Sequence, residues 1–193
     1  AQNKVLLHDM KSIETLARVD ILCVDKTGTI TEDKMSVQSF WALGQTEQIE
    51  LEELLGDFVR AQAPDTTTMG ALKEHFVKTR GRQVVKVVGF SSQYKYSGVE
   101  FKEGVYVLGA PELVLGKKYQ EYKSEIEGYS RRGYRVLILV QYSQALTGGE
   151  LTGEVIPCGF VVLANPVRQT APQTFKYFVE QGVQIKVISG DNP

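Results

Sequence analysis

The residues best suited to chemistry lie at positions 25–31, where the sequence is Asp-Lys-Thr-Gly-Thr-Ile-Thr. They follow an apolar run at 19–24, which is typical of a buried parallel strand that ends on Asp25. Ligands of open α/β sheets bind at the carboxyl ends of strands, and a carboxylate there can attack a phosphoryl group to form an aspartyl-phosphate. The type and position of Asp25 therefore predict a nucleophile for phosphoryl transfer.

The residues that follow Asp25 supply what a phosphate group needs. Lys26 adds positive charge, and Gly28 lets backbone N–H groups approach phosphate oxygens closely. Thr27 and Thr29 contribute hydroxyl groups, and Mg2+ would be needed to neutralise the phosphate charge. Each of these residues alone is an ordinary turn residue, so the prediction depends on the whole heptad.

A second group of residues, in the middle of the chain, suits a nucleotide. Phe90 offers an aromatic face on which adenine can stack, and Lys95 offers an ammonium group for the ring or a phosphate. The planar guanidinium of Arg135 matches the geometry of phosphate oxygens. From the residues alone, the alternatives are that Phe90 belongs to the core and that Lys95 and Arg135 are solvated. Neither a P-loop nor a dinucleotide-binding glycine motif is present in the sequence.

The heptad at 25–31 resembles the phosphorylation motif of the P-type cation-transporting ATPases, whose catalytic domain has the haloacid-dehalogenase-like fold. Further motifs that resemble those of the family follow in the family's order. They are Phe-Ser-Ser-x-x-Lys at 90–95, Gly-Ala-Pro-Glu at 109–112, Gly-x-Arg at 133–135, Asn-Pro-Val-Arg at 165–168 and Ser-Gly-Asp-Asn at 189–192. The resemblance covers nearly all of this chain but only a minority of a whole transporter.

The chain departs from the family pattern at several positions. Leu108 stands where the family has a lysine, and Met69 stands where it often has an acid near the adenine. Asn165 and Val167 depart from the Asp-Pro-Pro-Arg hinge motif, and Ser189 replaces the usual threonine. Because the adenine pocket loses a charge, we expect nucleotide binding to be weaker or differently tuned, and still present.

The resemblance implies a catalytic group of Asp25, Lys26 and Thr27, with Asp25 and Thr27 also holding Mg2+. It implies that Arg168 pairs with an acid or with the nucleotide across the hinge. It implies that Ser189 binds the transferred phosphoryl group and that Asp191 orients the nucleotide or a neighbouring backbone group. The full set expected to hold ATP is Phe90, Ser92, Lys95, Gly109, Arg135, Arg168, Ser189, Gly190 and Asp191.

The expected fold is α/β, with an α+β insert made of an antiparallel sheet and covering helices. Apolar residues at helical spacing predict helices at 46–60 and 67–79, and a polar helix is expected at 119–132. Alternating and β-branched runs predict the strands of the insert, and Lys102-Glu103-Gly104 predicts a hairpin turn between two of them. A helix at 170–181 and a strand at 183–188 complete a βαβ pattern.

The resemblance divides the chain into three parts. Residues 1–31 are expected to begin the phosphorylation domain, a partial haloacid-dehalogenase-like domain into which the nucleotide-binding domain at 32–158 is inserted. Residues 159–193 are expected to return to the phosphorylation domain. The sequence stops five residues after an apolar strand, which indicates an excised fragment.

Composition limits the partners. The 193 residues hold 22 Lys and Arg against 23 Asp and Glu, and the net charge of −1 argues against a nucleic-acid partner bound through bulk charge. A hydrophobic share of 42% is typical of a globular domain, and no apolar run approaches the roughly 20 residues that span a bilayer.

The resemblance implies a parent protein that couples ATP hydrolysis to cation transport through an aspartyl-phosphate on Asp25. A bacterial calcium pump is the preferred reading, with ATP, Mg2+, the cation, and the transmembrane and actuator domains as partners. The segment would lie on the cytoplasmic face of a bacterial plasma membrane. By itself it would be soluble and would bind nucleotide without turnover.

Two alternatives remain open at this point. A soluble phosphatase of the same superfamily usually carries a second acid two residues after the nucleophile, where this chain has Thr27. A non-catalytic nucleotide-binding module would keep the insert and dispense with the chemistry at Asp25.

Overall fold

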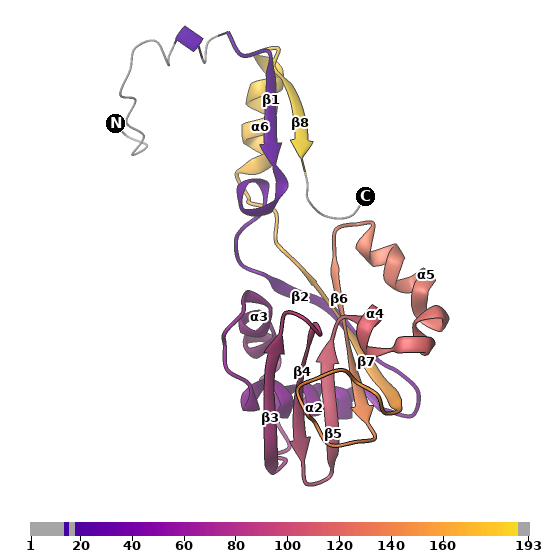
Figure 1. Cartoon of the computed structure of the whole chain (residues 1–193). Helices are drawn as coiled ribbons and strands as arrows, with labels where there is room; N and C mark the ends of the chain where they lie inside the picture. The colour runs from indigo at the N-terminus through magenta and orange to yellow at the C-terminus, as the bar shows by residue number, and fades with distance from the viewer. Residues whose placement is uncertain (1–13, 16–17, 189–193) are drawn as a thin grey trace. The chain divides into compact units, whose positions relative to one another are not determined.

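A computed structural model describes residues 14–15 and 18–188. Contacts along the chain divide it into two compact units (Figure 1). Among the described residues, the first combines those up to Asp33 with those from Val167 to Ile188, and the second is Lys34–Pro166.

The second unit is built on a six-stranded antiparallel sheet. Its strand order is β2-β7-β6-β5-β4-β3, so β2 and β3 form the two edges. The tight turn at Lys102 and Glu103 joins β4 to β5, as the sequence predicts. The strands are β2 (Ser36–Ala42), β3 (Val84–Ser91), β4 (Tyr96–Phe101), β5 (Gly104–Gly109), β6 (Arg135–Tyr142) and β7 (Val155–Ala164).

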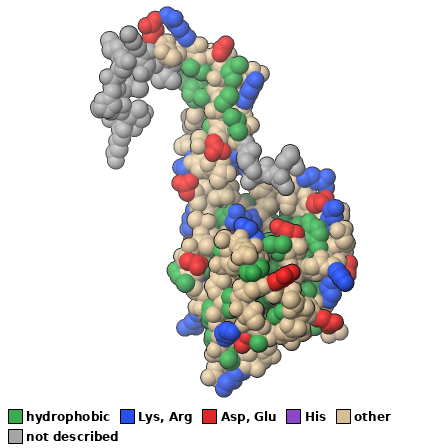
Figure 2. All heavy atoms as spheres, in the orientation of Figure 1, with side chains coloured by type: hydrophobic (Ala, Val, Ile, Leu, Met, Phe, Trp, Pro, Cys, Tyr) green, Lys and Arg blue, Asp and Glu red, His purple; other side chains and the backbone are tan. Residues whose placement is uncertain are grey.

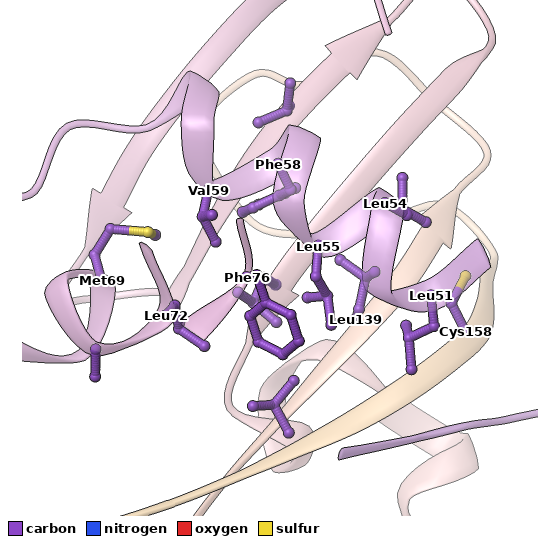
Figure 3. Close-up of a cluster of buried hydrophobic side chains, with 14 of the residues drawn as sticks. Leu51, Leu54, Leu55, Phe58, Val59, Met69, Leu72, Phe76, Leu139 and Cys158 are labelled. Atoms are coloured by element: carbon purple, nitrogen blue, oxygen red, sulfur yellow. The ribbon is translucent and has the colours of Figure 1, made fainter. Parts of the chain in front are cut away.

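Helices cover both faces of this sheet, because its central strands carry apolar residues at successive positions. On one face, α2 (Gln48–Ala61) and α3 (Thr67–His75) enclose a hydrophobic cluster (Figure 3). On the other face, α4 (Pro111–Val114), a 3-10 turn at Gly116–Lys118 and α5 (Tyr119–Ser130) enclose a second cluster. Leu139 belongs to the first cluster, whereas its neighbours Ile138 and Val140 belong to the second.

Strand β7 changes the expected position of the return to the first unit. Sequence analysis assigned residues from 159 onward to the returning segment, but β7 pairs with β2 and β6 as far as Ala164. Its residues serve both hydrophobic clusters, with Phe160 and Val162 on one face and Val161 and Leu163 on the other. The compact unit therefore extends to Pro166.

The first unit contains a parallel pair of strands, β1 (Ile21–Asp25) and β8 (Gln184–Ile188), with Asp25 opposite Ile188. Helix α6 (Ala171–Glu180) precedes β8, as the sequence predicts. The expected βαβ unit is wrong in its first strand, because β8 pairs with β1 whereas β7 belongs to the antiparallel sheet of the second unit. The expected burial of β1 is wrong for the described residues, because its side chains alternate between exposed and partly buried positions. Within residues 18–188, β8 is the only strand that pairs with β1.

Figure 2 shows acidic and basic side chains interspersed on the visible face of the molecule, and their numbers nearly balance over the whole sequence. Within the described residues, no helix has both the length and the apolar character required to cross a membrane.

A buried ion pair fixes the path of the chain between α3 and β3. The carboxylate of Asp57 on α2 accepts hydrogen bonds from the backbone N–H groups of Arg80 (3.2 Å) and Gly81 (2.9 Å). It also pairs with the buried guanidinium of Arg82 at 2.8 Å. The same segment passes so close to α2 that a Cβ on Gly56 would lie 1.7 Å from the Lys78 carbonyl oxygen. The expected helix at 67–79 therefore ends at His75, because the residues after it are drawn across α2.

We predict that Asp57→Ala lowers the free energy of unfolding by about 3–5 kcal/mol, because it leaves the buried Arg82 unpaired and releases two backbone N–H groups. Glu52→Ala is the matched control. Glu52 is also an acid of α2 bonded to the same segment, but its partner Lys78 is exposed, so the loss should stay within about 1 kcal/mol. Urea unfolding of both variants measures the difference, and equal losses would contradict the role given to Asp57.

Candidate functional site

The first site is the loop that follows Asp25. Asp25 ends β1 with its side chain exposed, and its Oδ1 accepts a long hydrogen bond of 3.4 Å from the backbone N–H of Thr27. The chain then makes a wide turn over Lys26–Ile30, closed by a 3.0 Å hydrogen bond from the Thr31 N–H to the Lys26 carbonyl. Asp25, Lys26 and Thr27 are thus gathered at the carboxyl end of β1, where an incoming phosphoryl group can reach the carboxylate.

Gly28 is required by the shape of this turn. Its φ of 78° lies in the left-handed region that side chains disfavour. In addition, a Cβ at this position would lie 2.6 Å from Oδ1 of Asp33. Any other residue would push the exposed Asp33 carboxylate aside and would strain the backbone at this φ, so the turn favours glycine.

Thr31 organises the loop, a role that sequence analysis did not give it. It is only 3% exposed, and its Oγ1 accepts a hydrogen bond from the Gly28 N–H (3.2 Å) and donates one to the Lys26 carbonyl (3.3 Å). Thr31 also forms an antiparallel bridge with Val167. In the sequence, the hydroxyl-bearing residue at the last position of the heptad is the signal that could have indicated this role of Thr31.

Arg168 lies against the same loop. Its Nη2 donates to the Gly28 carbonyl at 2.9 Å, and its Nε donates to the Thr31 carbonyl at 3.1 Å. Sequence analysis expected an acid or the nucleotide as its partner. In the structure, two nitrogens of the guanidinium instead donate to backbone carbonyl groups of the loop.

Apart from Arg168, which lies in the first unit, the described residues of the predicted nucleotide set come from one end of the six-stranded sheet. At this end β3 finishes at Ser91, β4 begins at Tyr96, β5 finishes at Gly109 and β6 begins at Arg135. Cross-strand pairing of Ser91 with Tyr96 and of Tyr96 with Gly109 confirms that these strand ends are neighbours. The antiparallel topology therefore collects residues that are far apart in the sequence.

The end of β3 and the turn that joins it to β4 carry three of these residues in accessible positions. Phe90 is 45% exposed, so the expectation from its residue type alone, a core position, does not hold. Ser92 and Lys95 are also exposed, and Lys95 has a φ of 54°, which is rare for a residue with a side chain. Strained backbone of this kind persists where the surroundings enforce it, and it is found at ligand sites more often than elsewhere.

Gly109 allows β5 to approach this turn. A Cβ on Gly109 would lie 2.5 Å from the Lys95 carbonyl oxygen and 2.6 Å from Cβ of Tyr96. The next residue, Ala110, donates its N–H to that same carbonyl at 2.9 Å. The contact of β5 with the turn therefore accounts for the glycine and places it beside Lys95.

Arg135 is held by a residue that the sequence did not single out. Its Nη1 donates to Oγ1 of Thr68, in the first turn of α3, at 2.8 Å. The hydroxyl of Thr68 in turn lies 3.5 Å from the sulfur of Met35. The spacing of Thr68 gave no sign of this contact, because the two residues are 67 positions apart.

Two of the departures from the family pattern, Leu108 and Met69, lie in the same hydrophobic cluster. Leu108 is 3% and Met69 5% exposed, and both belong to the hydrophobic cluster between the sheet and helices α2 and α3. Figure 3 shows Met69 directed into this cluster with Leu72 and Phe76. Both positions that carry charge in the family are thus apolar and buried here.

Whether the residues near Asp25 could hold Mg2+ depends on the donor atoms that they offer. The described residues contain no group of three or more His, Cys, Asp or Glu that could hold a metal by themselves. Mg2+ is often bound by one or two carboxylates together with substrate phosphates, and the oxygens of Asp25 and Thr27 are donors of the right kind. The donor set fits a metal that arrives with the nucleotide. Ser189, Gly190 and Asp191 lie outside the described residues.

Known proteins that resemble this chain in sequence include cation-transporting ATPases. No family model matches the chain. Over 99% of its length the chain is 38% identical to the "Calcium-transporting ATPase CtpE" of Mycobacterium tuberculosis, and over 98% it is 34% identical to the "Probable cation-transporting ATPase exp7" of Streptococcus pneumoniae. The predicted resemblance to the P-type ATPases is confirmed. The chain spans 24% of the length of each of these relatives.

Solved P-type ATPase structures share the fold. A zinc-transporting PIB-type ATPase in the E2.Pi state matches 94% of the chain with a TM-score of 0.65 at 18% identity, and the match covers 27% of that protein. The catalytic domain of the CPx-ATPase CopB-B, solved in connection with nucleotide binding, matches 97% of the chain with a TM-score of 0.61 at 12% identity. That match covers 60% of the CopB-B chain. The mixed α/β architecture with its antiparallel sheet is therefore that of a P-type ATPase nucleotide-binding domain.

We predict that Lys95→Gly raises the free energy of unfolding by about 1 kcal/mol, because glycine removes the left-handed strain at this position. Lys102→Gly is the matched control, since Lys102 is an exposed turn lysine without a positive φ. It should lower the free energy of unfolding, by up to about 1 kcal/mol, through the greater freedom of the unfolded chain. Urea unfolding measures the change in the free energy of unfolding for both variants. Changes of the same sign would contradict the assignment of strain to Lys95.

Proposed function

We propose that this chain is the catalytic segment of a longer P-type ATPase, which couples ATP hydrolysis to cation transport through an aspartyl-phosphate on Asp25. The observation that carries the proposal is the exposed carboxylate of Asp25 at the carboxyl end of β1, followed by a glycine-dependent turn. Similarity to cation-transporting ATPases over nearly the whole chain supports it.

The chemical step requires little beyond position and charge. An oxygen of Asp25 attacks the γ-phosphorus of ATP in line, the bond to the β,γ-bridging oxygen breaks, and ADP leaves with the electron pair. Lys26 stabilises the charge of the transferred group, and the hydroxyl of Thr27 lies within the same turn. Mg2+ bound with the phosphates would supply charge neutralisation, with Asp25 and Thr27 as its protein donors.

The nucleotide would occupy the end of the sheet at which β3 and β5 finish and β4 and β6 begin. Phe90 stacks on the adenine, Lys95 and Ser92 contact its polar atoms or the phosphates, and Gly109 and Arg135 complete the set. Leu108 and Met69 make the adjoining core apolar, so we expect base recognition to depend on stacking more than on charge. Ser189, Gly190 and Asp191 are assigned to the transferred phosphoryl group and the nucleotide.

The transported ion and the cellular setting extend the proposal to the whole protein. Relatives named as calcium-transporting ATPases favour calcium as the cation. In this proposal, transmembrane helices and an actuator domain outside this chain carry the ion, and the chain works at the cytoplasmic face of a bacterial plasma membrane. The segment alone binds nucleotide without turnover. Formation of the aspartyl-phosphate then shifts the membrane domain between its states.

We predict that the full-length transporter forms a phospho-enzyme from ATP and Mg2+ that is stable in acid and cleaved by hydroxylamine, as an acyl phosphate is. Asp25→Asn should abolish it, because an amide oxygen is a far weaker nucleophile than a carboxylate. Asp20→Asn, at the exposed start of the same strand segment, is the matched control and should leave it intact. A phospho-enzyme that still forms in the Asp25→Asn variant would contradict the proposal. Rapid release of phosphate without a phospho-enzyme would favour the phosphatase alternative.

We predict that ATP shifts the backbone amide signals of Phe90, Gly109 and Arg135 in an NMR titration of the labelled chain. Phe90→Ala should weaken binding about tenfold or more through loss of stacking. Thr68→Val should weaken it about two- to tenfold, because Arg135 loses the hydroxyl that holds it.

Thr67→Val serves as the control for Thr68→Val, since Thr67 is the exposed neighbour on the same helical turn. It should leave the affinity unchanged. A dispersed spectrum in which the amide signals of Phe90, Gly109 and Arg135 do not move with ATP would contradict the proposed nucleotide site.

A further inference from the structure

The end of β3 that carries Phe90 is interrupted by a β-bulge. Between its last two registered pairs with β4, strand β3 has two residues, Gly89 and Phe90, where β4 has only Ser97. Bulges of this kind are frequent at sheet edges and beside active sites, where they redirect a side chain. Strand β3 is an edge of the sheet (Figure 1), and the bulge lies at the end proposed for the nucleotide.

The bulge changes the face on which Phe90 lies. In a regular strand, residues two positions apart share a face. Phe90 would then lie on the same face as Val88, which packs against the second hydrophobic cluster. The extra residue interrupts this alternation, and the Phe90 side chain is 45% exposed. The bulge therefore accounts for an aromatic ring that is free to stack on a base.

A buried side chain from outside the sheet fastens this bulge. Gln62 directly follows α2 and is only 5% exposed. Its Nε2 donates to the Val88 carbonyl at 3.2 Å and to the Gly98 carbonyl at 3.0 Å. Val88 and Gly98 lie opposite each other and form the pair that immediately precedes the bulge. One amide group thus binds both strands at the point where regular pairing stops.

We propose that Gln62 is a positioning residue for Phe90, holding the bulge that presents the ring to adenine. This role rests on the proposed function and adds a residue that touches no part of the nucleotide. The NH2 group of an amide has two hydrogens, so it can serve both carbonyls at once. A side chain of similar size without donors would leave both carbonyls without this partner, and buried carbonyls require partners. Regular pairing of β3 with β4 would supply them and would remove the bulge.

The first test compares Gln62→Met with the control Gln48→Met in NMR titrations of the labelled chain with ATP. Gln48 begins the same helix, and its amide also bonds strand backbone, at Phe40 and Ala42 of the opposite edge strand β2. A dispersed spectrum shows that each variant is folded. Gln62→Met should raise the Kd for ATP about three- to tenfold, because stacking on Phe90 is partly lost. Gln48→Met should leave the Kd unchanged.

Double-mutant cycles separate positioning of the ring from a general loss of structure. In the Phe90→Ala background the ring is absent, so adding Gln62→Met should change the Kd for ATP by less than about twofold. In the Arg135→Ala background the ring is present, and the about three- to tenfold effect of Gln62→Met should remain. A merely structural role for Gln62 would raise the Kd by the same factor in both backgrounds.

A second measurement needs no substitution of Gln62. Coupling between two sites is reciprocal, so a base that binds at Phe90 must also affect the amide that holds the bulge. The side-chain NH2 signals of Gln62 should shift when ATP saturates the wild-type chain and should stay in place when ATP saturates Phe90→Ala. Those of Gln48 should not move in either protein.

Three results would overturn this role of Gln62. They are an unchanged Kd for ATP in folded Gln62→Met, equal effects of Gln62→Met in the two double-mutant backgrounds, and Gln62 side-chain signals that do not move in the wild type at saturating ATP. Failure of the proposed nucleotide site has a different signature, because Phe90→Ala by itself would then bind ATP as tightly as the wild type.

Discussion

The arrangement of this chain depends on the pairing of residue 31 with residue 167. The bridge between Thr31 and Val167, reinforced by the Arg168 side chain, joins segments about 140 positions apart in the sequence. In the other unit, the same two segments continue as neighbours, since Ser36 at the start of β2 pairs with Ala164 at the end of β7. A whole compact unit can be inserted at this point because the chain leaves and returns along adjacent paths. The same pairing shapes the loop that carries Asp25.

The inserted unit solves a different problem, which is to present polar and aromatic side chains at one end of a sheet. Two hydrophobic clusters on opposite faces hold the sheet rigid, and the Asp57 carboxylate fastens the connection that runs across α2. The residues assigned to the nucleotide lie beyond these clusters, at strand ends and in the turn that contains Lys95. The left-handed backbone of Lys95 is a local cost that the surrounding sheet sustains.

Local patterns in the sequence were sufficient for much of this architecture. Apolar spacing predicted α2, the turn residues Lys102 and Glu103 predicted the β4–β5 hairpin, and the apolar run before Asp25 predicted a strand in parallel pairing. Contacts made through backbone atoms were not predictable in this way. The partners of Arg168 are carbonyl groups, which every residue possesses, so no residue type near Gly28 announces them. The boundary of the inserted unit was placed too early because the continuous apolar run of Phe160 to Leu163 suits a strand in either unit, and only pairing with β2 decides it.

The central claim is that Asp25 becomes an acyl phosphate during turnover. Borohydride reduces acyl phosphates to alcohols, so trapping the full-length protein in the presence of ATP and Mg2+ should convert Asp25 to homoserine. Mass spectrometry of the peptide that contains residues 19–31 locates the change, with Asp20 in the same peptide as an internal reference. The account predicts homoserine at position 25 that depends on ATP and an unmodified residue 20. An unmodified position 25 in protein that is hydrolysing ATP would contradict it.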